Sequence, residues 1–227
     1  MLIVGVLAFA AAVVPLPPRE LEQARDKQDR SALERIASTY GTTAAKQPTD
    51  AQAQYEFARA QSYLAEVATE LKDKNGGRTA AEAGIKAAEQ AVALKAGVAE
   101  YHRLLGTLCG QLVPANVLAG LKYGKCAMQS INKAIELDPK SALAYVSRGV
   151  GNYYLPAAFG GGPEIALKDF DQAIQLDTKL AEAHLWRGLA LRKLNRNVDA
   201  RAAFSKSLQL NPARVWTKLQ LEKTPPQ

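Results

Sequence analysis

The chain has 227 residues, of which 48% are hydrophobic, 22% are charged and 7% are aromatic, and this balance suits one soluble helical domain. Its net charge of +7 allows contact with anionic partners such as acidic proteins, lipid headgroups or nucleic acid, but it also fits an ordinary solvated surface. Because the sequence has no arginine-rich run and no nucleic-acid-binding motif, we expect no nucleic-acid partner.

The first 14 residues, Met1–Val14, are apolar and uncharged. They are shorter than the ~20 residues that a membrane span needs, and their length matches the apolar core of a signal peptide. Ala8, Ala10 and Ala12 supply small residues at cleavage spacing. The segment therefore predicts export, with the bacterial periplasm as the expected location. The alternatives are a buried first helix and an uncleaved anchor in the inner membrane, which would be the only membrane contact.

Residues 15–48 are expected to form a helical hairpin that caps the amino-terminal end of the fold. Ser31 and Glu34 have the spacing of a capping box, which predicts that the second helix of this hairpin begins at Ser31. Apolar residues recur at helical spacing along this second helix, so one of its faces is predicted to be buried.

Residues 181–212 carry a pattern that recurs upstream. Gly188 and Ala200 are twelve residues apart, Pro212 follows after twelve more, and Phe204 lies between them. Small residues at the first two positions let antiparallel helices approach closely, the phenylalanine fills the space beside them, and the proline ends the second helix. The upstream blocks with the same second-helix spacing begin at Ala166, Ala127 and Gly84.

These blocks resemble the tetratricopeptide repeat family, whose pattern carries glycine, Ala-x3-Phe and proline at the same offsets. The resemblance implies an all-α fold: a right-handed α-solenoid of antiparallel helical hairpins, which stack because one hairpin cannot bury its apolar face alone. The seventeen residues from Gly149 to Ala166 predict a lengthened turn inside that repeat, and the earlier repeats have longer intervals still. Four repeats are predicted within residues 49–212, at about 51–95, 98–139, 142–178 and 181–212, followed by a capping helix and tail over 213–227.

Two turns within the predicted repeats are distinctive. Lys72–Arg78 is a polar turn with two glycines, but no Gly-Lys-Ser/Thr follows, so we reject a nucleotide-binding loop. Leu155–Pro163 contains three consecutive glycines, which permit unusual backbone angles. We expect Phe159, in this second turn, to pack back on the stack.

The two cysteines, Cys109 and Cys126, are candidates for a disulfide bond. The bond requires an oxidising compartment and Cα atoms within roughly 7 Å of each other. Cys126 lies one residue off the inward register of its helix, so the sequence leaves the bond open.

Residues that carry catalytic chemistry are few. The sequence has no catalytic pair of carboxylates, no nucleophile motif, no dinucleotide fingerprint and no metal-binding spacing. His102 and His184 are isolated, and we expect them to be packing or capping residues at the start of their helices. The sequence therefore predicts a protein that is not an enzyme and that needs no cofactor and no metal.

The resemblance implies a concave groove lined by the first helix of each repeat. Its mix of aromatic, aliphatic and cationic side chains suits a protein or peptide partner. The Lys and Asn clamp with which some family members grip a peptide carboxyl terminus is absent, and ordinary helix packing is the alternative role for each position. The residues carried over to the groove are Tyr55, Arg59, Arg103, Thr107, Ser147, Val150, Tyr154, Trp186, Leu189 and Lys193.

We therefore predict a non-catalytic interaction adaptor that is exported to the cell envelope. An alternative is a solute- or lipid-binding accessory component of an envelope transport system, in which the long turns would roof a pocket. An enzyme or enzyme accessory that depends on His102 or His184 is the third hypothesis.

Overall fold

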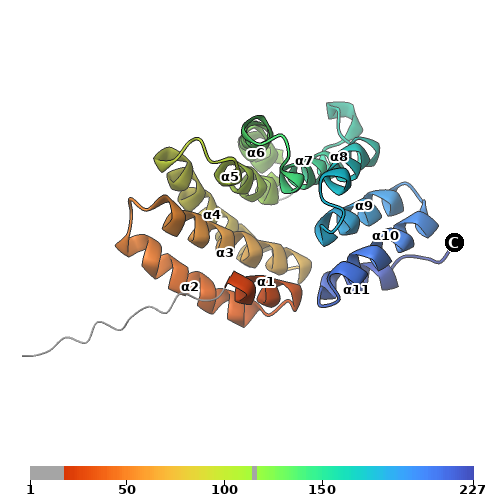
Figure 1. Cartoon of the computed structure of the whole chain (residues 1–227), viewed down its shortest axis with the longest axis horizontal. Helices are drawn as coiled ribbons and strands as arrows, with labels where there is room; N and C mark the ends of the chain where they lie inside the picture. Colours follow the sequence, from red (N-terminus) through yellow and green to blue (C-terminus); the bar gives the residue numbers. More distant parts are fainter. Residues whose placement is uncertain (1–17, 114–116) are drawn as a thin grey trace, which may run out of the picture.

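The computed structural model describes residues 18–113 and 117–227 (Figure 1). The predicted export segment, Met1–Val14, lies outside the described residues. Among the helices that are described, none combines the length and apolar character that crossing a membrane requires. The elements in chain order are α1 (Pro18–Asp26), α2 (Arg30–Lys46), α3 (Ala51–Glu70), α4 (Lys74–Leu94), α5 (Ala99–Leu112), α6 (Val117–Leu137), α7 (Ala142–Tyr154), the short 3-10 helix η2 (Ala157–Phe159), α8 (Pro163–Leu176), α9 (Ala181–Lys193), α10 (Asn197–Leu210) and α11 (Val215–Glu222).

Consecutive helices pack as hairpins: α3 with α4, α5 with α6, α7 with α8, and α9 with α10. Each hairpin also packs on the next, and the first helices touch in the order α3, α5, α7, α9. Figure 1 shows that the hairpins follow an arc whose inner side carries these four first helices. This is the stacked arrangement that the repeat pattern predicts.

Close approach of the two helices in a hairpin explains the glycine of the repeat pattern. A Cβ atom on Gly188 would lie 2.6 Å from the ring of Phe204, and one on Gly149 would lie 2.5 Å from the ring of Phe170. Both rings are fully buried. The glycines therefore face the phenylalanines across the hairpin, as the sequence pattern predicts.

The predicted capping box at the start of α2 is wrong. The helix begins at Arg30, and its cap is Asp29, whose Oδ1 accepts a hydrogen bond from the Ala32 backbone nitrogen at 3.0 Å. Gln28 has a φ of 55°, so the chain turns immediately before Asp29. The carboxylate of Asp29 therefore satisfies the helix start before Ser31 is reached.

The first repeat accommodates its extra residues differently from the prediction. Helices α3 and α4 have 20 and 21 residues, and Asp73 caps α4 by accepting from the Gly76 nitrogen at 2.9 Å. Gly76 and Gly77 thus lie in the first turn of α4 and not in the connecting turn. The extra residues lengthen the two helices of this hairpin.

In the third repeat the extra residues do form a long turn, between α7 and α8. Gly160 and Gly162 have φ values of 81° and 113°, in the left-handed region that favours glycine. The prediction that Phe159 packs back on the stack is wrong, because its side chain is 76% exposed. The short helix η2, followed by the left-handed Gly160, directs this ring to solvent.

A disulfide bond joins Cys109 of α5 to Cys126 of α6, with a Cα–Cα distance of 6.0 Å. This distance meets the geometric condition that the sequence left open. Cys109 is fully buried in the core between α3 and α6, so the bond ties the second hairpin together at its interior.

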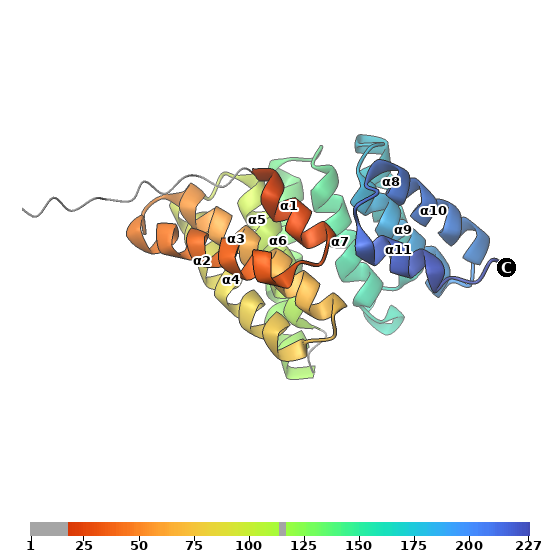
Figure 2. The same cartoon turned by 90° about the horizontal axis from the view of Figure 1, so that it is seen from below.

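The carboxyl-terminal end is held against the last hairpin. Arg201 of α10 donates to the backbone oxygen of Thr224 at 2.6 Å and to that of Leu221 at 3.1 Å. Trp216 of α11 packs against the apolar cluster of α9 and α10. In both views, α11 lies beside α1 at the opening of the arc, so the two ends of the fold meet there (Figures 1 and 2).

Candidate functional site

A hydrogen-bonded network occupies the middle of the inner side, between α3, α5 and α7. The guanidinium of Arg103 donates to both oxygens of Glu100 at 2.6 Å and to the hydroxyls of Thr107 and Ser147 at 3.3 Å. The Tyr55 hydroxyl donates to Glu100 at 3.1 Å. This network joins three successive first helices, so its polar groups are largely satisfied by one another.

Electrostatics within this network favour ionised Glu100. Although burial acts in the opposite direction, the charge and hydrogen bonds of Arg103 hold the pKa of Glu100 below its ordinary value. Burial, reinforced by the Glu100 charge, raises the pKa of the Tyr55 hydroxyl well above its ordinary value. The Tyr55 hydroxyl therefore stays protonated and acts as a hydrogen-bond donor.

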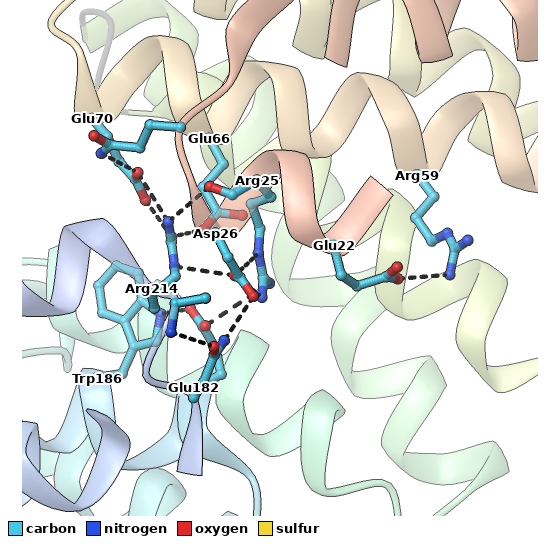
Figure 3. Close-up of polar contacts among 12 residues, drawn as sticks. Glu22, Arg25, Asp26, Arg59, Glu66, Glu70, Glu182, Trp186 and Arg214 are labelled. Carbon is cyan, nitrogen blue, oxygen red and sulfur yellow. Dashed lines mark hydrogen bonds and ion pairs between the residues drawn. The ribbon is translucent and has the colours of Figure 1, made fainter. Parts of the chain in front are cut away.

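A second ionic group links α1 to α3. Arg59 lies 3.3 Å from Glu22 of α1 (Figure 3). It also lies 2.8 Å from Glu56, one turn earlier on its own helix. The second carboxylate oxygen of Glu22 is buried without a hydrogen-bond partner among the described residues. The positive charge of Arg59 is thus shared between two carboxylates.

An aromatic cluster lies at the other end of the inner side, around Trp186 of α9. The ring centroids of Tyr153, Tyr154, Phe170 and Trp216 lie between 5.6 and 6.4 Å from that of Trp186. The indole nitrogen of Trp186 donates to Glu182 at 2.9 Å. Tyr154 is 50% exposed, so this cluster has an edge that another molecule can reach.

Between these groups, Arg214 joins the carboxyl-terminal end to α3. Its side chain is 2% exposed, and its Nη2 atom lies 2.5 Å from Glu66 and also contacts Glu70 (Figure 3). Arg214 precedes α11, whereas both glutamates lie near the end of α3. The repeat pattern could not predict this contact, because Arg214 lies beyond the last predicted repeat.

The ten residues carried over from the repeat family fall into different environments. Tyr55, Arg103, Thr107 and Ser147 form one network, and Arg59 belongs to the second ionic group. The remaining five lie near the aromatic cluster: Val150 and Leu189 pack in apolar clusters, Tyr154 and Trp186 are stacked edge to face, and Lys193 donates to the Tyr153 backbone oxygen at 2.9 Å.

The structure adds residues that repeat register did not identify. Three of the charged ones come from α1, which is not part of any repeat, and three more come from α3. We call the complete set the inner-side network. Its charged members are Glu22, Arg25, Asp26, Glu56, Arg59, Glu66, Glu70, Glu100, Arg103, Glu182 and Arg214.

The described residues contain no group of three His, Cys, Asp or Glu side chains placed to hold a metal ion. Two open hollows lie near the amino-terminal end, one of about 370 Å³ between α1 and α2 and one of about 610 Å³ between α2 and α3. None of the ten predicted groove residues lines either hollow. Neither hollow lies beside the long turn between α7 and α8, one of the turns that would roof a pocket in the transport-component alternative.

His102 and His184 occupy equivalent positions. The Nε2 atom of His102 lies 2.8 Å from the Ala96 backbone oxygen, and that of His184 lies 3.3 Å from the Thr178 backbone oxygen. Each ring therefore fastens the turn before its own helix. This is the packing or capping role that the sequence indicates.

Two family models match the chain. The model described as regulator of microtubule dynamics protein 1-3 matches residues 19–155, and a tetratricopeptide repeat model matches residues 181–214. No curated protein sequence matches the chain. The two models together cover most of the helical arc.

Solved structures of repeat proteins share the fold. A thermophilic tetratricopeptide repeat protein of Thermus thermophilus superposes with a TM-score of 0.59 at 19% identity, over 89% of this chain and 99% of that chain. MamA has a TM-score of 0.45 at 17% identity, over 88% and 97%. YrrB, described as a repeat protein with an unusual peptide-binding site, has a TM-score of 0.44 at 17% identity, over 82% and 99%. The first of these likenesses shows the tetratricopeptide repeat fold.

Proposed function

Because the chain belongs to the regulator of microtubule dynamics protein 1-3 family and folds as a tetratricopeptide repeat protein, we propose that it is a non-catalytic scaffold that binds a protein or peptide on its inner side. The observation that carries this proposal is the aromatic cluster around Trp186, where Tyr154 is 50% exposed beside a buried framework. Aromatic side chains in such a setting often supply much of the binding energy at protein interfaces.

Arg59 and Arg103 are paired with glutamates, so substituting them is not a clean test of binding on the inner side. Replacing Arg59 or Arg103 by glutamate would set like charges against Glu22, Glu56 or Glu100 and disturb the fold itself. A photo-crosslinking phenylalanine analogue at Tyr154 is a milder change, because the position is aromatic and half exposed. The matched control is the same analogue at Val198 of α10, which is 66% exposed and lies outside the inner side.

A partner of the inner side will be crosslinked from position 154 and not from position 198. Equal yields from the two positions, or none from position 154, would count against the inner side as the binding surface. Purification of the crosslinked product and mass spectrometry then identify the partner.

Export to the cell envelope is the second part of the proposal. The apolar segment Met1–Val14 supports it, and so does the Cys109–Cys126 bond, because disulfides persist mainly in oxidising compartments. An inner-membrane anchor formed by an uncleaved segment is the alternative location. Alkylation of free thiols in intact cells tests the export proposal: exported protein will not react until a reductant is added.

Microtubule binding is a second candidate function, because the family description refers to microtubule dynamics. The observation that favours it is electrostatic. Carboxylates outnumber arginines in the inner-side network, so the excess positive charge of the chain lies on the rest of its surface. Co-sedimentation with purified microtubules that falls steeply between ionic strengths of about 0.05 M and 0.2 M would support this candidate, and absence of binding at the lower value would exclude it.

A further inference from the structure

The two ends of the arc are fastened to each other by side chains from distant parts of the sequence. Arg214, which precedes α11, pairs with Glu66 and Glu70 of α3 and donates to the Arg25 backbone oxygen at 3.3 Å. Asn211 donates to Asp26 of α1 at 2.8 Å. These contacts bring the last turn of the fold onto its first and third helices (Figure 3).

A second pair reinforces this junction from within the arc. Arg25 of α1 lies 3.9 Å from Glu182 in the first turn of α9, and its guanidinium also lies 4.8 Å over the ring of Tyr63 on α3. Glu182 in turn accepts the hydrogen bond from Trp186. Helix α1 therefore spans the inner side from α3 to α9, next to the aromatic cluster where we place the binding surface.

The junction between the ends is polar. One apolar cluster joins α1, α2 and α3, with Leu21 and Leu33 at its centre, and another joins α9, α10 and α11, with Leu185 and Phe204 at its centre. These two clusters share no residue. Separating the ends therefore exposes charged and amide groups to water, and it leaves both apolar clusters intact.

The closed junction also leaves one buried polar atom unsatisfied. The Nε atom of Arg214 lies 3.8 Å from Asp26 and has no hydrogen-bond partner among the described residues. Burial of the ions and of an unpaired polar atom offsets part of the attraction between the ions, so the closed state is favoured by less than the number of ion pairs suggests.

We propose that this junction is an autoinhibitory latch, in which Arg214, Asn211 and Arg25 hold the ends together and the closed arc limits a partner to the exposed edge of the aromatic cluster at Tyr154. This inference rests on the proposed binding function of that side. Opening needs only small rotations spread over several hairpins, because each hairpin in a solenoid contacts only its neighbours. A partner that binds the open form alone will shift the equilibrium toward it.

Electron paramagnetic resonance measures the opening without a partner. Spin labels are placed on Ser31→Cys in α2 and Lys218→Cys in α11, both at exposed positions at the two ends. The native cysteines are bonded to each other and do not compete for the label. The latch predicts one short, narrow distance in the otherwise native full chain.

Two substitutions open the latch to different extents. Arg214→Ala removes the cation that pairs with both Glu66 and Glu70, so the ends will separate by about one helix diameter, roughly 10 Å. Asn211→Asp sets a second carboxylate against Asp26 at a half-buried site, which keeps the test decisive if Arg214→Ala fails to fold. Arg196→Ala, which removes an exposed ion pair with Asp199, is the matched control and will keep the short distance.

The native distance in a folded Arg214→Ala or Asn211→Asp chain would overturn the latch. Crosslinking from position 154 tests the inhibitory role separately. If the open, binding-competent state is rare in the native chain, the apparent affinity is reduced in proportion to its population. Arg214→Ala, which populates the open state, will therefore raise the yield about tenfold. An open arc with an unchanged crosslinking yield would overturn the inhibitory role. An open arc that crosslinks nothing from position 154 refutes the proposed binding function and, with it, the inhibitory role, while the opening stands as a conformational result.

Discussion

Arg214 and Glu66 are 148 residues apart in the sequence, yet their side chains form a 2.5 Å ion pair at the point where the two ends of the arc meet. Glu70 shares the same guanidinium from one turn further along α3. The pair joins the segment before α11 to α3, whereas most helix contacts join neighbours along the chain. In the latch that we propose, this pair sets how far the inner side is open.

The Glu66 carboxyl predicts how stability depends on pH. Burial raises its pKa to about 7, with Glu182 and Glu70 adding to the rise and Arg214 and Arg25 opposing it. A carboxyl whose pKa is higher in the folded state binds a proton on folding, so its contribution is full below the unfolded pKa and is lost as the pH rises through about 7. We expect the free energy of unfolding to fall by about 1–3 kcal/mol between pH 5 and pH 8 through this group.

Urea unfolding across that pH range measures this effect. Glu66→Gln is the matched control, because it keeps the shape and cannot ionise. A Glu66→Gln chain with the same pH dependence as the native chain would show that another group is responsible.

Removal of the Arg214 side chain is expected to destabilise the fold by about 1–3 kcal/mol. The loss is smaller than the roughly 3–5 kcal/mol typical of breaking a buried ion pair, because the ends can separate and rehydrate Glu66 and Glu70. Arg196→Ala, at an exposed pair, is expected to change stability by less than about 1 kcal/mol. Urea unfolding measures both changes. Equal losses of stability in Arg214→Ala and Arg196→Ala would contradict a buried ion pair at Arg214.

Replacing glycine by alanine is expected to have opposite effects on stability at Gly188 and at Gly110. Gly188→Ala forces a methyl group to within 2.6 Å of Phe204 and is expected to cost about 1–3 kcal/mol. Gly110 lies in α5 with open space around its Cβ position, so Gly110→Ala is expected to stabilise the helix by about 0.5–1 kcal/mol. Thermal denaturation of both variants checks the prediction, and a stabilised Gly188→Ala chain would contradict the close helix approach.

The disulfide predicts sensitivity to reductant. Reduction of the Cys109–Cys126 bond is expected to lower the free energy of unfolding by about 2–4 kcal/mol, because the unfolded chain gains conformational freedom. Denaturation with and without dithiothreitol measures the change. The Cys109→Ser, Cys126→Ser double variant should not respond to the reductant, and a native chain that does not respond either would argue that the bond contributes nothing.

The hairpins were predictable because their determinants are local and repeated. Gly188 faces Phe204 sixteen residues later, and Gly149 faces Phe170 in the same way across a longer interval. Two local predictions were wrong because a neighbouring residue determines the structure. Asp29 caps α2 in place of Ser31, and the left-handed conformation of Gly160 turns Phe159 to solvent. Which residue caps α2 and where the Phe159 ring points depend on backbone angles that the sequence pattern does not specify.

The latch was not predictable from the sequence. Arg214 stands outside the repeats, and Arg25 lies in a capping helix with no register of its own. Their partners follow only once the curvature of the arc is known, because it brings α1 to α9 and α11. Arg59 and Arg103 were identified as groove residues, but their neutralisation by Glu22, Glu56 and Glu100 depends on side-chain positions that repeat register does not give.

The most direct test of the scaffold is photo-crosslinking from Tyr154, with Val198 as the control position, in the native chain and in Arg214→Ala. The account predicts one reproducible protein partner from position 154, none from position 198, and a higher yield when the latch is removed. Equal crosslinking from both positions, or no product from position 154 in either chain, would contradict binding on the inner side.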